Sequence, residues 1–136
     1  MNVLLDASAI MAIILNEPNR SSVIELTENA ILLSPEVISF EIGNALISIY
    51  RKRKITEEEL MEAYRNYTLI PLRVVDVDIG KALKIACKYD IYAYDAYYLE
   101  TANRLKLPLI TFDERMQKVS LQLKIELLNK AIKRGR

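Results

Sequence analysis

Two short apolar runs in this chain each end in an aspartate. The first extends from Val3 to Leu5 and is followed by Asp6, and the second covers residues 109–112 and is followed by Asp113. Short apolar runs are typical of strands that are buried on both faces of a parallel sheet. In open α/β sheets, ligands bind just beyond the carboxyl ends of the strands. We therefore expect both aspartates at the same site-forming edge of one sheet.

Segments with strand and helix patterns alternate along the rest of the chain. We predict strands over residues 1–6, 30–33, 69–75 and 109–112, and a short last strand over 125–128. We predict helices over residues 7–14, 20–27, 36–53, 57–67, 79–89, 95–107 and 114–123. This alternation is typical of an α/β fold with a parallel sheet. It indicates one domain over residues 1–136, in which 129–136 form a basic C-terminal tail.

Local signals support several of these boundaries. Thr56 and Glu59 have the spacing of a capping box, and Asp78 is placed to cap the helix that follows it. Pro35 suits the first turn of a helix. Pro71 restricts its strand to an edge or a bulge, because proline cannot donate a ladder hydrogen bond.

Composition narrows the chemistry that the chain can perform. It contains no His and only one Cys, so a histidine base, a histidine metal ligand and an intrachain disulfide are excluded. Cys87 lies in an apolar helix pattern and is expected to be inert core. With three Gly, the chain has no glycine-rich phosphate loop. Oxygen ligands for hard cations such as Mg²⁺ or Mn²⁺ remain for phosphate chemistry.

The net charge of +1 means that nucleic-acid binding would depend on local patches. The run Arg51-Lys52-Arg53-Lys54 is interpreted as a solvated helix end, with an RNA-backbone contact as the alternative. The tail cations allow the same two interpretations: Lys130, Lys133, Arg134 and Arg136. We find no secretory signal and no apolar run long enough to cross a membrane, so the cytoplasm is the expected compartment.

Two further acids, Glu41 and Asp95, stand near the starts of predicted helices. An aspartate at such a position can simply cap its helix, and this alternative holds for Asp6, Asp95 and Asp113. Glu41 lies in a helix that is apolar nearly all round, where it would be buried without a partner unless it faced a site. Asn44, one turn later, could join the same polar patch. Taken together, the four acids favour one shared site.

Four motifs occur in order along the chain: Asp6-Ala7-Ser8-Ala9, Phe40-Glu41-Ile42-Gly43-Asn44-Ala45-Leu46, Tyr94-Asp95-Ala96-Tyr97-Tyr98-Leu99-Glu100-Thr101-Ala102 and Thr111-Phe112-Asp113-Glu114-Arg115. This series resembles the acidic motifs of PIN domains, and the chain as a whole is similar to the small VapC-type toxins of prokaryotic toxin–antitoxin pairs. Two features depart from the pattern. Lys124 stands where relatives often have Gly, and the basic tail after Leu128 is less typical.

The resemblance implies a three-layer α/β/α domain with a four- to five-stranded parallel sheet. It also implies an Mg²⁺- or Mn²⁺-dependent endoribonuclease. It carries the metal and catalytic roles to Asp6, Glu41, Asp95 and Asp113, with Asp6 and Asp95 as the firmest direct ligands. Ser8 and Thr111 match the hydroxyl positions beside the first and last acids. One or two metal ions would suit this pattern.

Implied partners are an RNA substrate and an antitoxin protein. We expect the tail of the antitoxin to cover the acids with a basic side chain near Asp6 and Asp95. A homodimer is expected because the helices around Asp95 are rich in tyrosine, which suits half-apolar surfaces. The tyrosines in question are interpreted as packing or dimer contacts, with base stacking as the alternative: Tyr92, Tyr94, Tyr97 and Tyr98.

Other functions were weighed against this one. A haloacid-dehalogenase-type phosphatase needs a second acid where this chain has Ser8. A receiver domain needs paired acids after its first strand and a lysine after its fifth strand, and neither is present. A PIN fold that binds RNA or protein without turnover is an alternative of a different class. An RNA-processing nuclease without an antitoxin is another, although such proteins usually carry extra modules such as a zinc ribbon.

Overall fold

The structure is a computed structural model that describes residues 1–129. Within this range the strands are β1 (Asn2–Leu5), β2 (Ile31–Pro35), β3 (Leu72–Val75) and β4 (Leu109–Ile110). The helices are α1 (Ala7–Ile14), α2 (Arg20–Leu26), α3 (Ile38–Arg51), α4 (Glu57–Thr68), α5 (Ile79–Tyr89), α6 (Ala93–Leu105) and α7 (Glu114–Gln122). None of these helices is long and apolar enough to cross a membrane.

The four strands form one parallel sheet in the order β3-β2-β1-β4. β1 therefore lies between β2 and β4, and its residues Val3, Leu4 and Leu5 are fully buried. Because all strands are parallel, their carboxyl ends meet at one edge of the sheet. The segments after β1 and β4, which carry Asp6 and Asp113, are neighbours at that edge, as the two apolar runs predicted.

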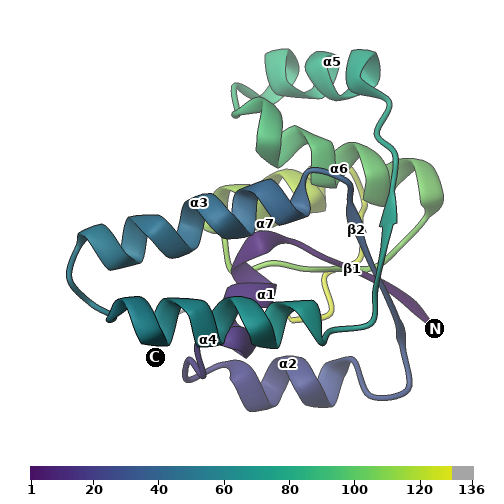
Figure 1. The fold of residues 1–136 in the computed structure, drawn as a ribbon. Coiled ribbons are helices and arrows are strands. Elements are labelled where there is room, and N and C mark those ends of the chain that lie inside the picture. The colour runs from purple at the N-terminus through teal and green to yellow at the C-terminus, as the bar shows by residue number, and fades with distance from the viewer. Residues whose placement is uncertain (130–136) are drawn as a thin grey trace.

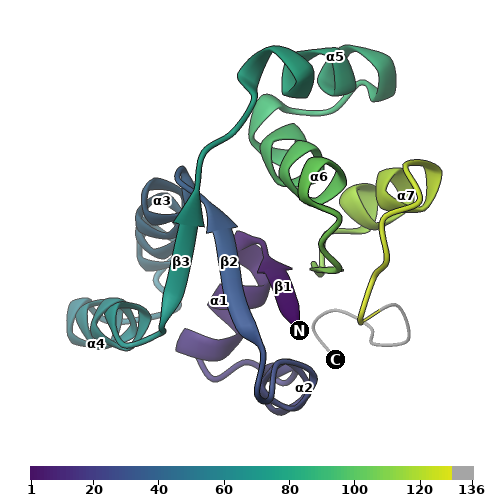
Figure 2. The same cartoon turned by 90° about the vertical axis from the view of Figure 1, so that its right-hand side faces the viewer.

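Helices cover both faces of the sheet and give three layers (Figures 1 and 2). α1 packs against α2, α3 and α4 on one side, and α6 and α7 lie on the other. α5 packs along α6 and stands further from the sheet. The predicted three-layer α/β/α architecture with a four-stranded parallel sheet is confirmed.

Three local predictions are confirmed in detail. The Thr56 hydroxyl accepts from the Glu59 backbone N–H at 3.1 Å, and the Glu59 carboxylate accepts from the Thr56 N–H at 2.9 Å, which completes a capping box on α4. Asp78 caps α5 by accepting from the Lys81 N–H at 3.1 Å. β3 is an edge strand and begins directly after Pro71, where a missing ladder donor does no harm.

Two predictions about strands were wrong. Pro35 is the last residue of β2, where it pairs with Val75, so α3 begins later than predicted, at Ile38. Residues 125–128 form an isolated bridge between Leu127 and Leu109 rather than a fifth strand. The reason is that β4 is only two residues long and offers little edge for a further strand.

Cys87 and Lys124 are both exposed at the surface. Cys87 is exposed rather than core, because α5 packs mainly against α6 and, among its described residues, buries only Ala82. Lys124 has a left-handed backbone with φ of 60° in the turn after α7. This explains why glycine would suit the position, since a side chain costs about 1 kcal/mol there. The predicted basic tail beyond Asn129 lies outside the described residues.

Candidate functional site

Asp6 follows β1 directly and is 3% exposed. Its Oδ1 accepts from the Ala9 backbone N–H at 3.0 Å and from the Ser8 hydroxyl at 2.7 Å, so it is the N-cap of α1. Its Oδ2 accepts from the Thr111 hydroxyl, which comes from the segment after β4. Asp6 therefore caps α1, as one interpretation of the sequence predicted, and also contacts the segment that follows β4.

Ser8 and Thr111 tie the ends of β1 and β4 together. The Ser8 hydroxyl accepts from the Phe112 N–H at 2.8 Å while it donates to Asp6. The Thr111 hydroxyl accepts from the Asp113 N–H at 3.1 Å while it donates to Asp6. Each hydroxyl thus donates one hydrogen bond and accepts another, one within its own segment and one across to the other strand end, which fixes the orientation of the Asp6 carboxylate.

Asn129 continues this network and was not predicted from the sequence. Its Oδ1 accepts from the Thr111 N–H at 3.3 Å, and its Nδ2 donates to the Thr111 carbonyl at 2.8 Å. The buried amide therefore replaces the strand partner that residue 111 would have in a longer sheet. A polar residue directly after the apolar stretch 125–128 was the only signal in the sequence.

Asp113 and Asp95 approach the edge from two different helices. Asp113 caps α7 by accepting from the Met116 N–H at 2.9 Å and is half-buried. Asp95 lies in the first turn of α6, where Tyr92 holds the N-cap position, so Asp95 is not a capping residue. Helix capping therefore explains the position of Asp113 but does not explain that of Asp95.

Glu41 lies in the first turn of α3 and accepts a hydrogen bond from the Tyr98 hydroxyl of α6. The expectation that Glu41 would lack a partner outside a site was wrong, because buried Tyr98 supplies one from the opposite face of the sheet. A buried tyrosine needs a partner for its hydroxyl, and this requirement was the missed signal. Within the described residues, Asn44 is exposed and forms no hydrogen bond with the four acids.

The four acids influence one another electrostatically. Burial raises the pKa of Asp6 to about 6, against the lowering effect of its hydrogen bonds, and the charge of Asp113 adds to the rise. Burial, together with the charges of Asp113 and Asp6, raises the pKa of Asp95 to about 6. The pKa of Glu41 is raised by burial and, less strongly, by Asp95. The acids therefore form one coupled group.

The sequence matches the family model described as PIN domain over residues 3–121. The chain belongs to the PIN domain family. The match includes all four acids, Ser8 and Thr111, and it stops before Asn129. PIN domains are in general nucleases. No curated protein matches the chain significantly.

Solved structures share the PIN fold at low sequence identity. PAE2754 from Pyrobaculum aerophilum is 24% identical with a TM-score of 0.65, over 91% of this chain and 98% of that chain. VapBC2 from Rickettsia felis, bound to a DNA fragment from its promoter, is 14% identical with a TM-score of 0.64, over 93% and 97%. A toxin–antitoxin complex from Klebsiella pneumoniae is 16% identical with a TM-score of 0.55, over 82% and 86%.

PIN nucleases generally use divalent metals, and the donors of this chain suit such ions. Carboxylates and hydroxyls are hard oxygen ligands, which Mg²⁺ and Mn²⁺ prefer. The mutual repulsion of Asp6, Asp95 and Asp113 is the kind of charge that a bound cation offsets. Among residues 1–129, no three acid or thiol side chains are close enough, as placed, to enclose an ion. The residues therefore suit a divalent cation by the chemistry of their oxygen atoms and by their charge.

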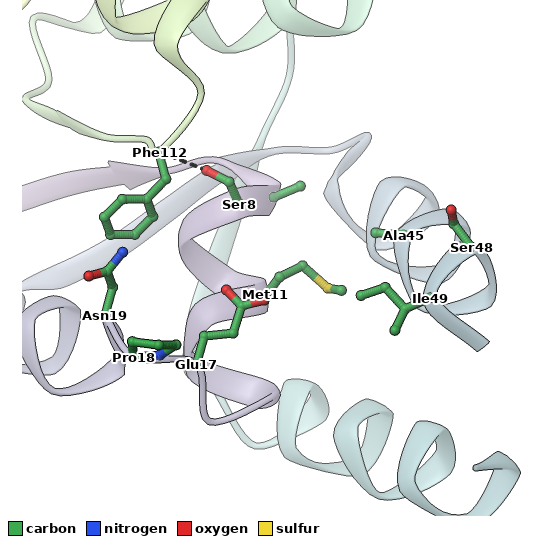
Figure 3. A pocket seen from close by; sticks show the side chains of 10 residues that line it. Ser8, Met11, Glu17, Pro18, Asn19, Ala45, Ser48, Ile49 and Phe112 are labelled. Carbon is green, nitrogen blue, oxygen red and sulfur yellow. Dashed lines mark hydrogen bonds between the residues drawn. The ribbon is translucent and has the colours of Figure 1, made fainter. Parts of the chain in front are cut away.

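Two cavities flank the acids of this PIN domain. One, of about 590 Å³, is lined by Tyr92, Asp95, Asp113, Glu114 and Arg115. The other, of about 460 Å³, lies between α1, α3 and the loop before α2. Figure 3 shows that Ser8 and its hydrogen bond to Phe112 border the second cavity, and that Met11 points towards Ile49 inside it. Ser8 thus lies between Asp6 and this largely apolar cavity.

The cationic run 51–54 lies at the other end of α3 from Glu41. All four of its residues are exposed, and three of them, Arg51, Arg53 and Lys54, line a cavity of about 540 Å³. Ten residues of helix separate Glu41 from Arg51, which is roughly 15 Å along the axis. The run therefore lies at the end of α3 that is remote from Glu41.

Proposed function

We propose that this PIN domain is an Mg²⁺- or Mn²⁺-dependent endoribonuclease that acts in the cytoplasm as the toxin of a toxin–antitoxin pair. The observation that carries the nuclease proposal is the coupled group of acids at the carboxyl edge of the sheet. Burial and mutual charge raise the pKa of Asp6 and Asp95 to about 6. Such perturbed carboxylates, gathered where α/β folds bind ligands, are typical of functional sites.

The chain's own residues would have distinct roles in this site. Asp6 and Asp95 would bind the metal directly, and Glu41 and Asp113 would complete the site directly or through water. Asp6 already accepts three hydrogen bonds, which leaves about one of its four acceptor positions for a cation. When bound, the ion would supply an acidified water and offset charge on the phosphate. Tyr98 would hold Glu41 in place.

Metal-dependent cleavage is the first test of this proposal. The purified protein should cut single-stranded RNA in the presence of Mg²⁺ or Mn²⁺ and lose that activity in EDTA. Attack by water should leave 5′-phosphate and 3′-hydroxyl ends, which end-labelling and mass spectrometry distinguish. Ends with a 2′,3′-cyclic phosphate would contradict the mechanism. Binding of RNA without any cleavage would instead support the alternative of a PIN fold that acts as a binding module.

We also propose that the cationic run 51–54 contacts the RNA backbone. Its distance of roughly 15 Å along α3 corresponds to a few nucleotides of extended chain from the acids. RNA binding measured over a range of salt concentrations tests the contact. Replacement of Arg51 and Lys52 by Ala should weaken RNA binding and make it less dependent on salt, because fewer counterions are released. An unchanged salt dependence would leave this run as a solvated helix end.

An antitoxin partner is supported by two features of the described surface. One is the group of acids at the carboxyl edge of the sheet. The other is the largely apolar cavity of Figure 3, which is lined by Ser8, a hydrogen-bond donor to Asp6. A peptide with a basic side chain followed by an apolar one would fit both. The solved structures from Klebsiella pneumoniae and Rickettsia felis are a toxin–antitoxin complex and a VapBC protein, respectively. This likeness supports a partner of the same kind for this chain.

A homodimer is proposed on different grounds from those that the sequence suggested. Tyr98 points inward to Glu41, so it is not available at a surface. Ile79 and Leu83 of α5 are 53% and 48% exposed, and they lie one turn apart on the same helix. Two copies that met along this face of α5 would bury both side chains, and the acid edge would stay open.

Mass measurements test both assembly proposals together. By light scattering, the chain alone should have the mass of two copies. Co-expression with the product of the adjacent reading frame should give a larger complex that no longer cuts RNA. Leu83→Asp should convert the dimer to a monomer, whereas Lys84→Asp on the same helix should not. A parent that is monomeric at all concentrations would exclude the dimer, and an active protein without such a neighbour would favour an RNA-processing nuclease.

A further inference from the structure

Tyr92 occupies a position that the fold itself does not explain. It is the N-cap of α6, where small polar residues are preferred because their side chains accept from the first free N–H groups. The Tyr92 side chain makes no such bond, and it is 75% exposed. A large aromatic ring that neither caps its helix nor packs into the core is expected to serve another purpose.

The neighbouring tyrosines have structural roles and provide a contrast. Tyr98 is buried and donates to Glu41. Tyr94 packs edge-on against Tyr97, with ring centres 5.6 Å apart and planes inclined by 78°. Tyr92 instead lines the cavity of about 590 Å³ together with Asp95 and Asp113. α6 therefore contains three tyrosines with structural partners, whereas Tyr92 at its N-cap lines the site cavity.

Arg115 lies in the wall of the same cavity and carries the opposite charge to its acids. Its guanidinium is exposed, and its charge lowers the pKa of Asp95 against the other influences. A guanidinium matches the geometry of a phosphate with paired hydrogen bonds. Within one cavity, the described residues thus offer a flat ring, a cation and two acids of the coupled group.

We propose that this cavity binds the nucleotide next to the cleaved phosphodiester, with its base stacked on the ring of Tyr92 and its phosphate held by Arg115. The inference rests on the proposed nuclease function and adds a substrate subsite to it. Stacking accepts any base, because every base has an aromatic face. It also requires the base to be unpaired. The substrate class is therefore RNA that is single-stranded at the cut, with weak base preference at this position.

Binding measurements can test the subsite without cleavage. The probes are a short fluorescein-labelled RNA with a mapped cleavage position and two versions that lack the base on one or the other side of it. Binding is followed by anisotropy in EDTA, in protein that carries Asp95→Asn so that the RNA stays intact. Tyr92→Ala should weaken binding of the complete RNA about tenfold, which corresponds to one lost stacking contact. Tyr92→Phe, which keeps the ring, should restore it.

The abasic RNAs distinguish stacking from a general loss of fit. One of the two should bind about tenfold more weakly than the complete RNA, and Tyr92→Ala should not weaken it further. Tyr94→Ala is the matched control, because Tyr94 is also exposed on α6 but lies outside the cavity, and it should bind like the parent. Arg115→Ala should weaken binding and reduce the salt slope by about one, and Arg115→Lys should restore part of the affinity.

Two results would overturn the subsite. Equal binding by Tyr92→Ala and its parent, in a protein that cuts RNA, would remove the subsite and leave the nuclease proposal intact. An equal further loss with both abasic RNAs would show that Tyr92 acts on the fold rather than on a base. A parent that neither binds nor cuts RNA would instead remove the proposed function, and the subsite with it.

Discussion

Asp95→Asn should abolish RNA cleavage while the metal-free protein remains at least as stable as the parent. Loss of a side chain that merely orients a metal ligand costs about 10–100-fold in metal affinity or activity, so loss of a ligand should cost at least about 100-fold. Asp95 caps no helix, and its ionised form is disfavoured by burial and by Asp113 and Asp6. Removal of that charge should therefore stabilise the metal-free protein, by about 1–2 kcal/mol after screening by solvent.

The gain in unfolding free energy from Asp95→Asn should depend on pH, and the raised pKa of Asp95 determines the direction. The folded protein raises the pKa of Asp95 to about 6, whereas an unfolded aspartate titrates near ~3.9. The folded state therefore binds the proton more tightly, and the destabilising effect is absent below about pH 4 and complete above about pH 6. The difference in unfolding free energy between Asp95→Asn and the parent should be seen at neutral pH and vanish in acid.

Thermal melts with and without divalent metal measure both effects. Metal stabilises the state that binds it, so the parent should gain melting temperature with Mg²⁺ or Mn²⁺. Asp95→Asn should gain less, and Asp90→Asn, an exposed aspartate at the end of α5, should behave like the parent. A strongly destabilised Asp95→Asn protein that kept the full response to metal would mean that Asp95 is structural and that the site assignment fails.

The second large effect is expected at Asn129. Its amide is 1% exposed and bonds both the N–H and the carbonyl of Thr111. Asn129→Ala would leave the Thr111 N–H buried without this partner, while Gln117 still donates to the carbonyl at 2.8 Å. The expected loss of unfolding free energy is about 2–3 kcal/mol, because each unpaired buried group costs about 1–3 kcal/mol. Urea titration measures it directly.

Asn129→Ala should also lower the rate of RNA cleavage by about tenfold or more. The reason is that Thr111 orients Asp6, and loss of a residue that orients a metal ligand lowers activity by about this factor. Asn103→Ala, at an exposed position on α6, is the matched control and should change stability by less than about 0.5 kcal/mol. Asn129→Ala protein with unchanged stability and activity would show that the bridge does not support the strand end. Gln117→Ala offers a milder variant, since it removes only one bond to Thr111.

Local patterns in the sequence predicted most of the fold and placed the four acids. The bounds of α1 and α5 and the capping box at Thr56 were predicted because they depend on neighbouring residues. The contacts from Tyr98 to Glu41 and from Asn129 to Thr111 were missed, because they join residues that are 57 and 18 positions apart. The exposure of Cys87 was missed for a related reason: an apolar helix pattern does not show how many layers will cover it.

One of the hydrogen bonds that orient Asp6 joins segments that lie far apart in the sequence. Thr111 is 105 positions from Asp6, and Thr111 is itself held by Asn129. Under the proposed function, a polypeptide that is still being translated cannot assemble this site until its last described residues have left the ribosome. Nuclease activity would then begin only after residue 129 has emerged, which gives a partner time to bind the surfaces that form earlier.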